Sequence, residues 1–150
     1  HTPVAEKLTA VMHENGCDIW LIAHGWNNNQ FLAYLITTAG VTNTPIISTV
    51  GSSFGFTGIQ GNEAGQLKAS PDGKKLAMAI RNAGTSLNSK VDAFEIYDFN
   101  ASTGVVSNAL ALVSSAGGSG NFEFPYGVEF SSDNQKVYVS CEFSNIFQFN

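Results

Sequence analysis

Apolar and polar residues alternate along this chain in short stretches that are the length of a β-strand and end at turn-forming residues. The pattern repeats, because residues 67–79 are matched 61 positions later by residues 128–140 and, more weakly, 57 positions earlier by residues 10–22. At the centre of each copy lies a pair of residues that favours a tight turn: Asn15-Gly16, Asp72-Gly73 and Asp133-Asn134. The pattern therefore predicts three β-hairpins of one design.

Further strand-like stretches follow each hairpin, at residues 31–37, 94–99 and 146–149, and the first two are followed by a fourth at 46–50 and 109–113. Four successive antiparallel strands are the blade of a β-propeller. The expected fold class is therefore all-β, a β-propeller fragment of two complete blades, at about residues 7–52 and 64–114, and three strands of a third at about 126–150. Because the third blade stops short and leaves an uncovered edge and face, we expect the remaining blades to lie outside these 150 residues.

The apolar side of each alternating stretch is expected to pack between blades. The residues assigned to these contacts are Val11, Ile19, Leu21, Leu67, Leu76, Met78, Phe94, Ile96, Val128, Phe130, Val137 and Val139.

The hairpin sequences resemble those of a known family. Residues 69–77 (ASPDGKKLA) and 126–133 (YGVEFSSD) are similar to the SPDG hairpins of WD40-like and YVTN-type β-propellers. More narrowly, residues 16–21 (GCDIWL), 94–99 (FEIYDF) and 103–108 (TGVVSN) resemble the N-terminal propellers of large Bacteroidetes-type secreted surface proteins. That resemblance implies a propeller that precedes adhesive repeats and a C-terminal signal for type IX secretion or gliding-motility surface display. It implies an extracellular or cell-surface location and supplies no catalytic residue.

The lengths of the connections predict which face of the molecule carries recognition residues. The turns within the hairpins are minimal, whereas the connections expected at the opposite end, residues 24–30, 51–65, 81–90 and 114–125, are long. Long loops on a rigid scaffold commonly carry binding residues. The candidates on this loop-rich face are His24, Trp26, Asn28, Phe54, Phe56, Arg81, Phe122 and Tyr126.

Aromatic and amide side chains in one place suit a glycan or a protein segment, since rings cover apolar faces and amides bond hydroxyl or backbone groups. The alternative interpretation is that the loop aromatics fill gaps between adjacent blades and that the Gly, Asn and Ser residues form solvated connections.

The amino-acid composition limits the classes of partner that the chain can bind. Only 13% of the residues are charged and the net charge is −5, so the chain lacks the basic groove that a nucleic acid needs. No stretch approaches the ~20 apolar residues of a membrane-spanning helix. The chain begins at His1 without an initiator Met, so we expect a removed leader or an excerpt of a longer protein. Cys17 and Cys141 are expected to be separate thiols.

Enzyme motifs are weak. Residues 51–55 (GSSFG) match the G-x-S-x-G pattern of hydrolases, but two glycines follow where that motif needs a helix, and no His follows His24. The histidines and cysteines lack metal-site spacing, so we expect no metal, no cofactor and no catalytic residue. Asp72 and Asp133 recur because the turn requires them, and no other two carboxylates are singled out as an acid/base pair.

The function expected from the sequence is a non-enzymatic extracellular binding or display module of a large secreted or cell-surface protein, such as an adhesin or a type IX secretion substrate. Its partners would be a protein or glycan on the loop-rich face, and the remaining blades or an assembly partner on the open edge. Two alternatives stay open. One is a polysaccharide-active propeller enzyme whose acid/base pair lies partly in missing blades, and the other is a structural spacer.

Overall fold

The computed structural model describes residues 3–53, 63–81, 91–116, 122, 124–142 and 145–150. In these residues the chain forms strands and turns and contains no helix, so none is present there that could cross a membrane. The strands are β1 (Val4–Met12), β2 (Ile19–Gly25), β3 (Gln30–Thr37), β4 (Gly40–Val41), β5 (Ile46–Thr49), β6 (Leu67–Ala69), β7 (Lys75–Ile80), β8 (Val91–Asn100), β9 (Val105–Ala116), β10 (Pro125–Phe130), β11 (Val137–Cys141) and β12 (Ile146–Phe149).

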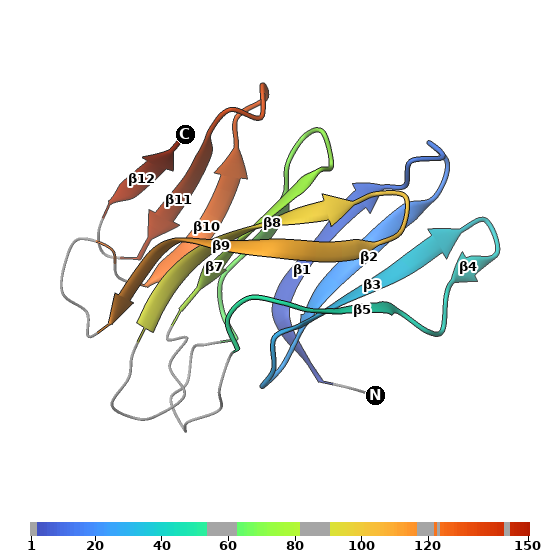
Figure 1. The fold of residues 1–150 in the computed structure, drawn as a ribbon, viewed down its shortest axis with the longest axis horizontal. Helices are drawn as coiled ribbons and strands as arrows, with labels where there is room; N and C mark the ends of the chain where they lie inside the picture. Colours follow the sequence, from blue (N-terminus) through green and yellow to red (C-terminus); the bar gives the residue numbers. More distant parts are fainter. Residues whose placement is uncertain (1–2, 54–62, 82–90, 117–121, 123, 143–144) are drawn as a thin grey trace.

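These strands form three open antiparallel sheets in chain order (Figure 1). Sheet A contains β1 to β5, sheet B contains β6 to β9, and sheet C contains β10 to β12. In each sheet every strand pairs with the next one along the chain, except that both β4 and β5 pair with β3. The all-β class and the succession of antiparallel strands are thereby confirmed.

The three hairpins share one register. Met12 pairs with Ile19 in sheet A, Ala69 with Leu76 in sheet B, and Phe130 with Val137 in sheet C. These pairs are separated by the same 57 and 61 positions that relate the sequence repeats. Because side chains alternate between the two faces of a strand, a shared register places equivalent residues on equivalent faces.

The turn that fixes this register is built from side-chain hydrogen bonds. The Ser70 hydroxyl donates to Asp72 Oδ1 at 2.7 Å, and the same carboxylate oxygen accepts from Lys74 N at 3.1 Å. These bonds lower the pKa of Asp72, with the Ser70 hydroxyl as the main cause. The same bonds, at 2.6 and 3.1 Å, recur in the β10–β11 turn among Ser131, Asp133 and Gln135.

The third residue of each turn has a positive φ, which glycine and asparagine tolerate best. The residues are Gly16 (+70°), Gly73 (+69°) and Asn134 (+60°). In the first turn Asn15 takes the place of Asp72, and its Oδ1 accepts from Cys17 N at 3.0 Å. The weak first copy of the sequence repeat therefore has the same local structure as the other two.

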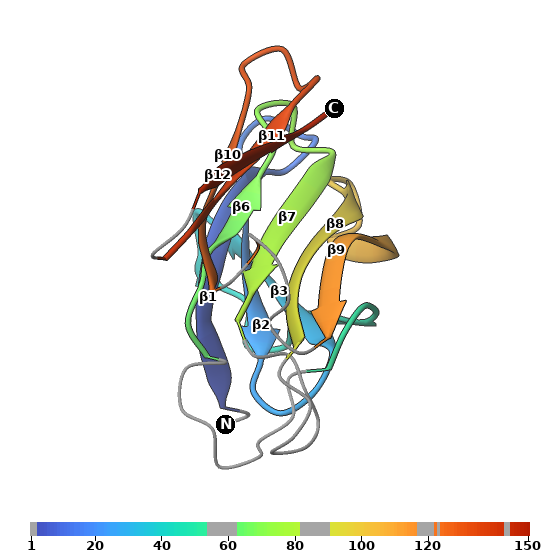
Figure 2. The same cartoon turned by 90° about the vertical axis from the view of Figure 1, so that its left-hand side faces the viewer.

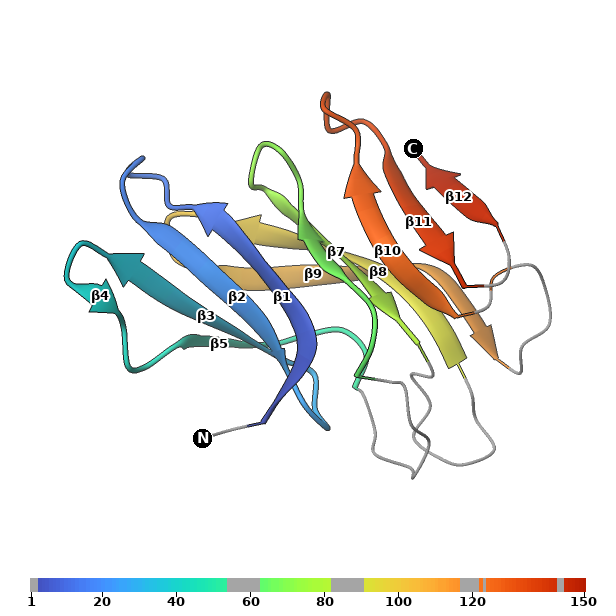
Figure 3. The same cartoon turned by 180° about the vertical axis from the view of Figure 1, so that it is seen from behind.

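The sheets pack face to face, with sheet B between sheets A and C (Figures 1 and 3). Between sheets A and B, one buried cluster contains Trp20, Ile22 and Phe31 opposite Leu76, Met78 and Tyr97. Between sheets B and C, a second contains Ala77, Ala79 and Phe94 opposite Phe130, Val137 and Val139. Burial of these apolar faces is the main force that holds the sheets together.

The first strands of the three sheets lie next to one another along one side of the molecule (Figures 2 and 3). Backbone bonds join them: Glu6 N donates to Glu63 O at 3.3 Å, and Gln66 N donates to Tyr126 O at 2.8 Å. On the opposite side, β5 and β9 are in contact, and Val106 N donates to Ser48 Oγ at 2.9 Å.

Several predicted elements differ in extent from the observed ones. β8 and β9 extend beyond the predicted 94–99 and 109–113, and β4 was not predicted. The connection predicted at residues 24–30 is shorter, because His24 and Gly25 belong to β2 and Gln30 to β3. The apolar residues of β2 pair with β3 as far as His24–Phe31, so the strand continues past the point where polar residues suggest a loop.

Most residues assigned to the contacts between blades are buried. Three of the twelve are exceptions: Ile19 is 36% exposed, and Leu21 and Ile96 are half-buried. Ile19 and Leu21 lie on the face of sheet A that points away from sheet B, where the described residues place no further sheet.

The packing between sheets A and B predicts a large effect for Leu76. Its side chain is fully buried, so Leu76→Ala should lower the free energy of unfolding by about 3 kcal/mol through lost burial and a residual cavity. The matched control is Leu110→Ala in the same sheet, where the side chain is 58% exposed and the loss should stay below about 0.5 kcal/mol. Equilibrium urea unfolding measures both, and equal losses would contradict the packing described.

Candidate functional site

His24 lies inside the protein and not on a loop surface. Its ring is fully buried at the end of β2 and meets the Phe31 ring edge to face, with centroids 4.8 Å apart. Nδ1 lies 2.9 Å from Gly25 O, so the neutral ring donates its Nδ1 proton to that carbonyl. Burial lowers the pKa of His24 to about 4, and the charge of Lys7 acts in the same direction.

Trp26 and Asn28 belong to the β2–β3 turn. Asn28 Oδ1 accepts from Gln30 N at 2.8 Å and its Nδ2 donates to Trp26 O at 3.1 Å, which closes the turn. Trp26 N donates to Pro3 O at 2.9 Å, and its ring is half-buried. These bonds give Asn28 a local structural role.

Arg81 and Phe122 lie at the junction of sheets B and C. Arg81 Nη1 is 2.8 Å from Glu142 Oε2, and the guanidinium is 4.7 Å from the centre of the Phe124 ring. Phe122 is 7% exposed and packs edge to face on Phe147 at 5.2 Å. Arg81 therefore contacts the residue that follows β11, and Phe122 contacts β12.

Tyr126 is the one predicted candidate among the described residues that is exposed, at 47%. Phe54 and Phe56 lie outside the described residues. Of the described candidates, Trp26 and Asn28 lie in the turn that follows His24, Arg81 and Phe122 lie at the junction of sheets B and C, and Tyr126 lies in β10.

A pocket of about 360 Å³ lies beside Tyr126, where the first strands of the three sheets meet. We call it the first-strand pocket, and its lining is Glu6, Leu8, Gly65, Gln66, Leu67 and Tyr126. Gln66 joins the start of sheet B to β10 of sheet C beside the pocket, since its Oε1 accepts a hydrogen bond from Val128 N at 2.7 Å.

The three repeats contribute different residues to this pocket. At the spacing of 57 and 61 residues, Leu8, Gly65 and Tyr126 occupy equivalent positions. Gly65 has a φ of +110°, and a Cβ there would lie 2.6 Å from Ala79 O, so no larger residue fits without a backbone shift. Sheets A and C thus supply larger residues to the lining of the pocket than this position of the second repeat does.

Lys7 lies directly behind this pocket and was not found from the sequence. Its side chain is fully buried, and Nζ donates to Glu63 O at 3.2 Å and to Ala64 O. Burial lowers the pKa of Lys7 to about 8. The signal was present in the alternation of β1, because Lys7 shares its side of the strand with the buried Ala5 and Val11.

A buried carboxylate lies farther along the boundary between sheets A and B. Glu95 is 4% exposed and accepts bonds from Ser52 N at 3.1 Å, from the Ser52 hydroxyl and from the Tyr97 hydroxyl. Burial raises the pKa of Tyr97, so this hydroxyl stays protonated as a donor. Gly51, with a φ of +81°, approaches so closely that a Cβ would lie 2.7 Å from Glu95 Oε2. The glycine and serine of the hydrolase-like motif therefore anchor a segment to sheet B.

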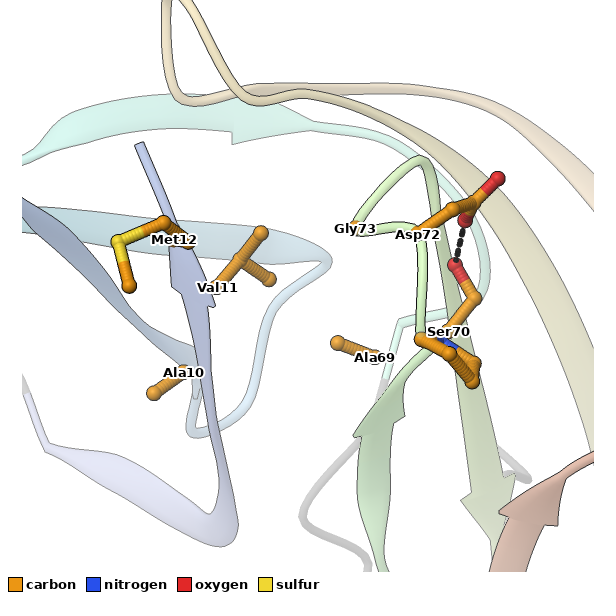
Figure 4. Close-up of a pocket in the computed structure, with 8 residues that line it drawn as sticks. Ala10, Val11, Met12, Ala69, Ser70, Asp72 and Gly73 are labelled. Atoms are coloured by element: carbon orange, nitrogen blue, oxygen red, sulfur yellow. Dashed lines mark hydrogen bonds between the residues drawn. The ribbon is translucent and has the colours of Figure 1, made fainter. Parts of the chain in front are cut away.

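A second hollow lies at the turn end of the sheets. It measures about 150 Å³, with Ala10, Val11 and Met12 of β1 on one side and the β6–β7 turn on the other (Figure 4). The Ser70–Asp72 bond closes the turn beside it. The polar groups of Ser70 and Asp72 are thus engaged in the turn.

Metal-binding and thiol chemistry find little support in the described residues. Within them, no three His, Cys, Asp or Glu side chains gather as metal ligands. Cys17 is exposed and Cys141 is buried, and neither forms a disulfide.

No protein-family model matches the chain, and no curated protein is significantly similar to it. The function must therefore be argued from the site itself.

The buried neutral His24 predicts an acid-sensitive fold. Its pKa is about 4 in the folded state and about 6.5 in an unfolded chain, so the unfolded chain binds more protons between these values. The stabilising effect of the neutral ring is complete above pH 6.5 and should fall by about 3 kcal/mol as the pH drops to 4.

Urea unfolding at several pH values tests this expectation. His24→Asn keeps a donor for Gly25 O but does not titrate, so its stability should fall much less than that of the wild type over this range. His13→Asn is the control, because His13 is half-buried and stacks on Trp20 in the first turn. Equal pH profiles for wild type and His24→Asn would contradict the prediction.

Proposed function

We propose that sheets A, B and C are consecutive blades of a WD40-like β-propeller, at about residues 7–52, 64–114 and 126–150. The proposal is supported by the shared hairpin register and by the stacking of the sheets in chain order. It is also supported by the position of the first strands, which lie together on one side as strands around a common axis would.

We further propose that this module is a non-enzymatic binding or display part of a large secreted or cell-surface protein. The observation that carries the binding function is the first-strand pocket, where an exposed Tyr ring lies beside a carboxylate and an amide on a rigid scaffold. The extracellular location and a type IX secretion route rest on the resemblance of the hairpin sequences to surface propellers.

A glycan is the ligand class that these groups fit best. A Tyr ring covers the apolar face of a sugar, and Glu6 supplies a carboxylate acceptor for hydroxyl groups. The hollow of about 360 Å³ also matches the lower end of the size range of small-ligand sites. The sheets behind it, joined by the Gln66 and Lys7 bonds, hold these groups in place.

Binding of the intact chain to a panel of glycans and of peptides tests this function. Tyr126→Ala should weaken glycan binding about tenfold, because stacking on the ring contributes on the order of 1 kcal/mol. Tyr126→Phe keeps the ring and should keep most of the affinity. Trp26→Ala is the matched control, since Trp26 is an aromatic residue outside the pocket lining.

Unchanged glycan binding by a folded Tyr126→Ala protein would contradict the pocket. If the chain binds peptides and not glycans, and Tyr126→Ala loses that binding, the ligand of the pocket is a protein segment and not a glycan. An absence of binding to either panel would favour a spacer role over a binding role.

A further inference from the structure

Sheet A leaves exposed part of a face that its counterparts bury. On this face Ala23 and Leu32 are at most 7% exposed, whereas the residues nearer the first turn are more open. In sheet B, Leu67, Leu76 and Met78 point toward sheet A and are at most 1% exposed. In sheet C the equivalent residues Val128, Val137 and Val139 point toward sheet B and are at most 4% exposed.

The equivalent residues of sheet A are Ala10, Ile19 and Leu21, which lie on its outer face with Met12. Ala10 is exposed, Ile19 is 36% exposed and Leu21 is half-buried. On this face, which we call the outer A face, Met12 is 56% and Ile47 is 55% exposed. Side chains of this kind, gathered on one sheet, mark an interaction surface.

The surface that would fit the outer A face lies on sheet C, at the opposite end of the row of three sheets. Sheet A contacts sheet B through the side of Trp20 and Ile22, and sheet B contacts sheet C through the equivalent Ala77 and Ala79. In sheet C the equivalent residues are Tyr138 and Ser140, on the side that points away from sheet B. Ile146 pairs with Ser140 on this outer C face and is 74% exposed.

We infer that the outer A face of one copy of this chain docks against the outer C face of a second copy. The contact continues an interface that the chain already forms twice, between sheets A and B and between sheets B and C. Aromatic Tyr138 takes the place of aromatic Trp20, and Ile146 adds apolar surface beside it. The inference rests on the proposed succession of blades and not on the ligand.

Such a contact is head to tail, because different surfaces of the two copies meet. Head-to-tail contacts close into a ring when the rotation between copies permits it and otherwise extend into a chain. A ring of copies would complete the circle of sheets and would bring the first-strand pockets of all copies around one axis.

The mass of the chain in solution tests the inference. One chain weighs 15.9 kDa, and light scattering during gel filtration at micromolar concentration should give a multiple of that mass. Met12→Lys on the outer A face and Ile146→Lys on the outer C face should each raise the dissociation constant at least about tenfold. Both side chains are more than half exposed, so neither substitution disturbs the interior, and circular dichroism checks that each variant is folded.

A mixture of Met12→Lys and Ile146→Lys tests directly whether the outer A face of one copy meets the outer C face of another. The Met12→Lys copy keeps an intact outer C face and the Ile146→Lys copy keeps an intact outer A face, so the mixture should form heterodimers that neither variant forms alone. Leu110→Lys is the control, because Leu110 is 58% exposed in the middle sheet and should leave the mass unchanged.

Three results would overturn the inference. One is a wild-type chain that stays at the mass of one copy throughout the micromolar range. Another is loss of association in Met12→Lys but not in Ile146→Lys, which would mean that two outer A faces meet. The third is association that neither substitution weakens. None of these results affects the test of the pocket, because glycan binding by Tyr126 can be measured on a single copy.

Discussion

The arrangement of every sheet depends on the register of its first hairpin, and a few short hydrogen bonds set that register. In the second and third sheets a serine hydroxyl and an aspartate carboxylate close the turn, and in the first sheet Asn15 does so. A slip of one residue would turn each side chain of the strand to the opposite face. The apolar faces that hold the sheets together therefore exist only because the turn residues recur at fixed places in the chain.

Given that register, the two interfaces are filled in complementary ways. Large residues such as Trp20 and Phe31 meet Leu76 and Met78 between sheets A and B, whereas small Ala77 and Ala79 leave room for Phe130 between sheets B and C. The first interface also contains polar groups, namely Lys7, His24 and Glu95, which are costly to bury without partners. Segments distant in the chain supply the partners of Lys7 and part of those of Glu95, whereas His24 bonds to the carbonyl of the next residue, Gly25. Satisfaction of Lys7 and Glu95 therefore depends on correct docking of these segments.

The sequence predicted the strands and turns well, but it did not predict which residues expected in loops are buried. The turns at Asp72 and Asp133 and the strands around them follow from local alternation and turn chemistry, and the structure contains them in the predicted register. His24 was assigned to a surface loop because polar residues follow it, yet β2 continues through it and its ring is buried against Phe31 of β3. Burial of Lys7 could have been predicted from the alternation of β1, but its carbonyl partners could not, because they belong to a distant segment.

The first-strand pocket shows how a repeated scaffold acquires a unique site. Identical repeats would place identical side chains around the line where the first strands meet, and the surface there would be uniform. Here the equivalent positions hold Leu8, Gly65 and Tyr126, so the three repeats contribute an aliphatic side chain, a glycine and an aromatic ring to the lining. The strands bulge at this level in sheets A and C, and bulges redirect side chains. The proposed binding at this point would require no long loop, because the scaffold is kept by the residues that repeat and the ligand would be contacted by those that do not.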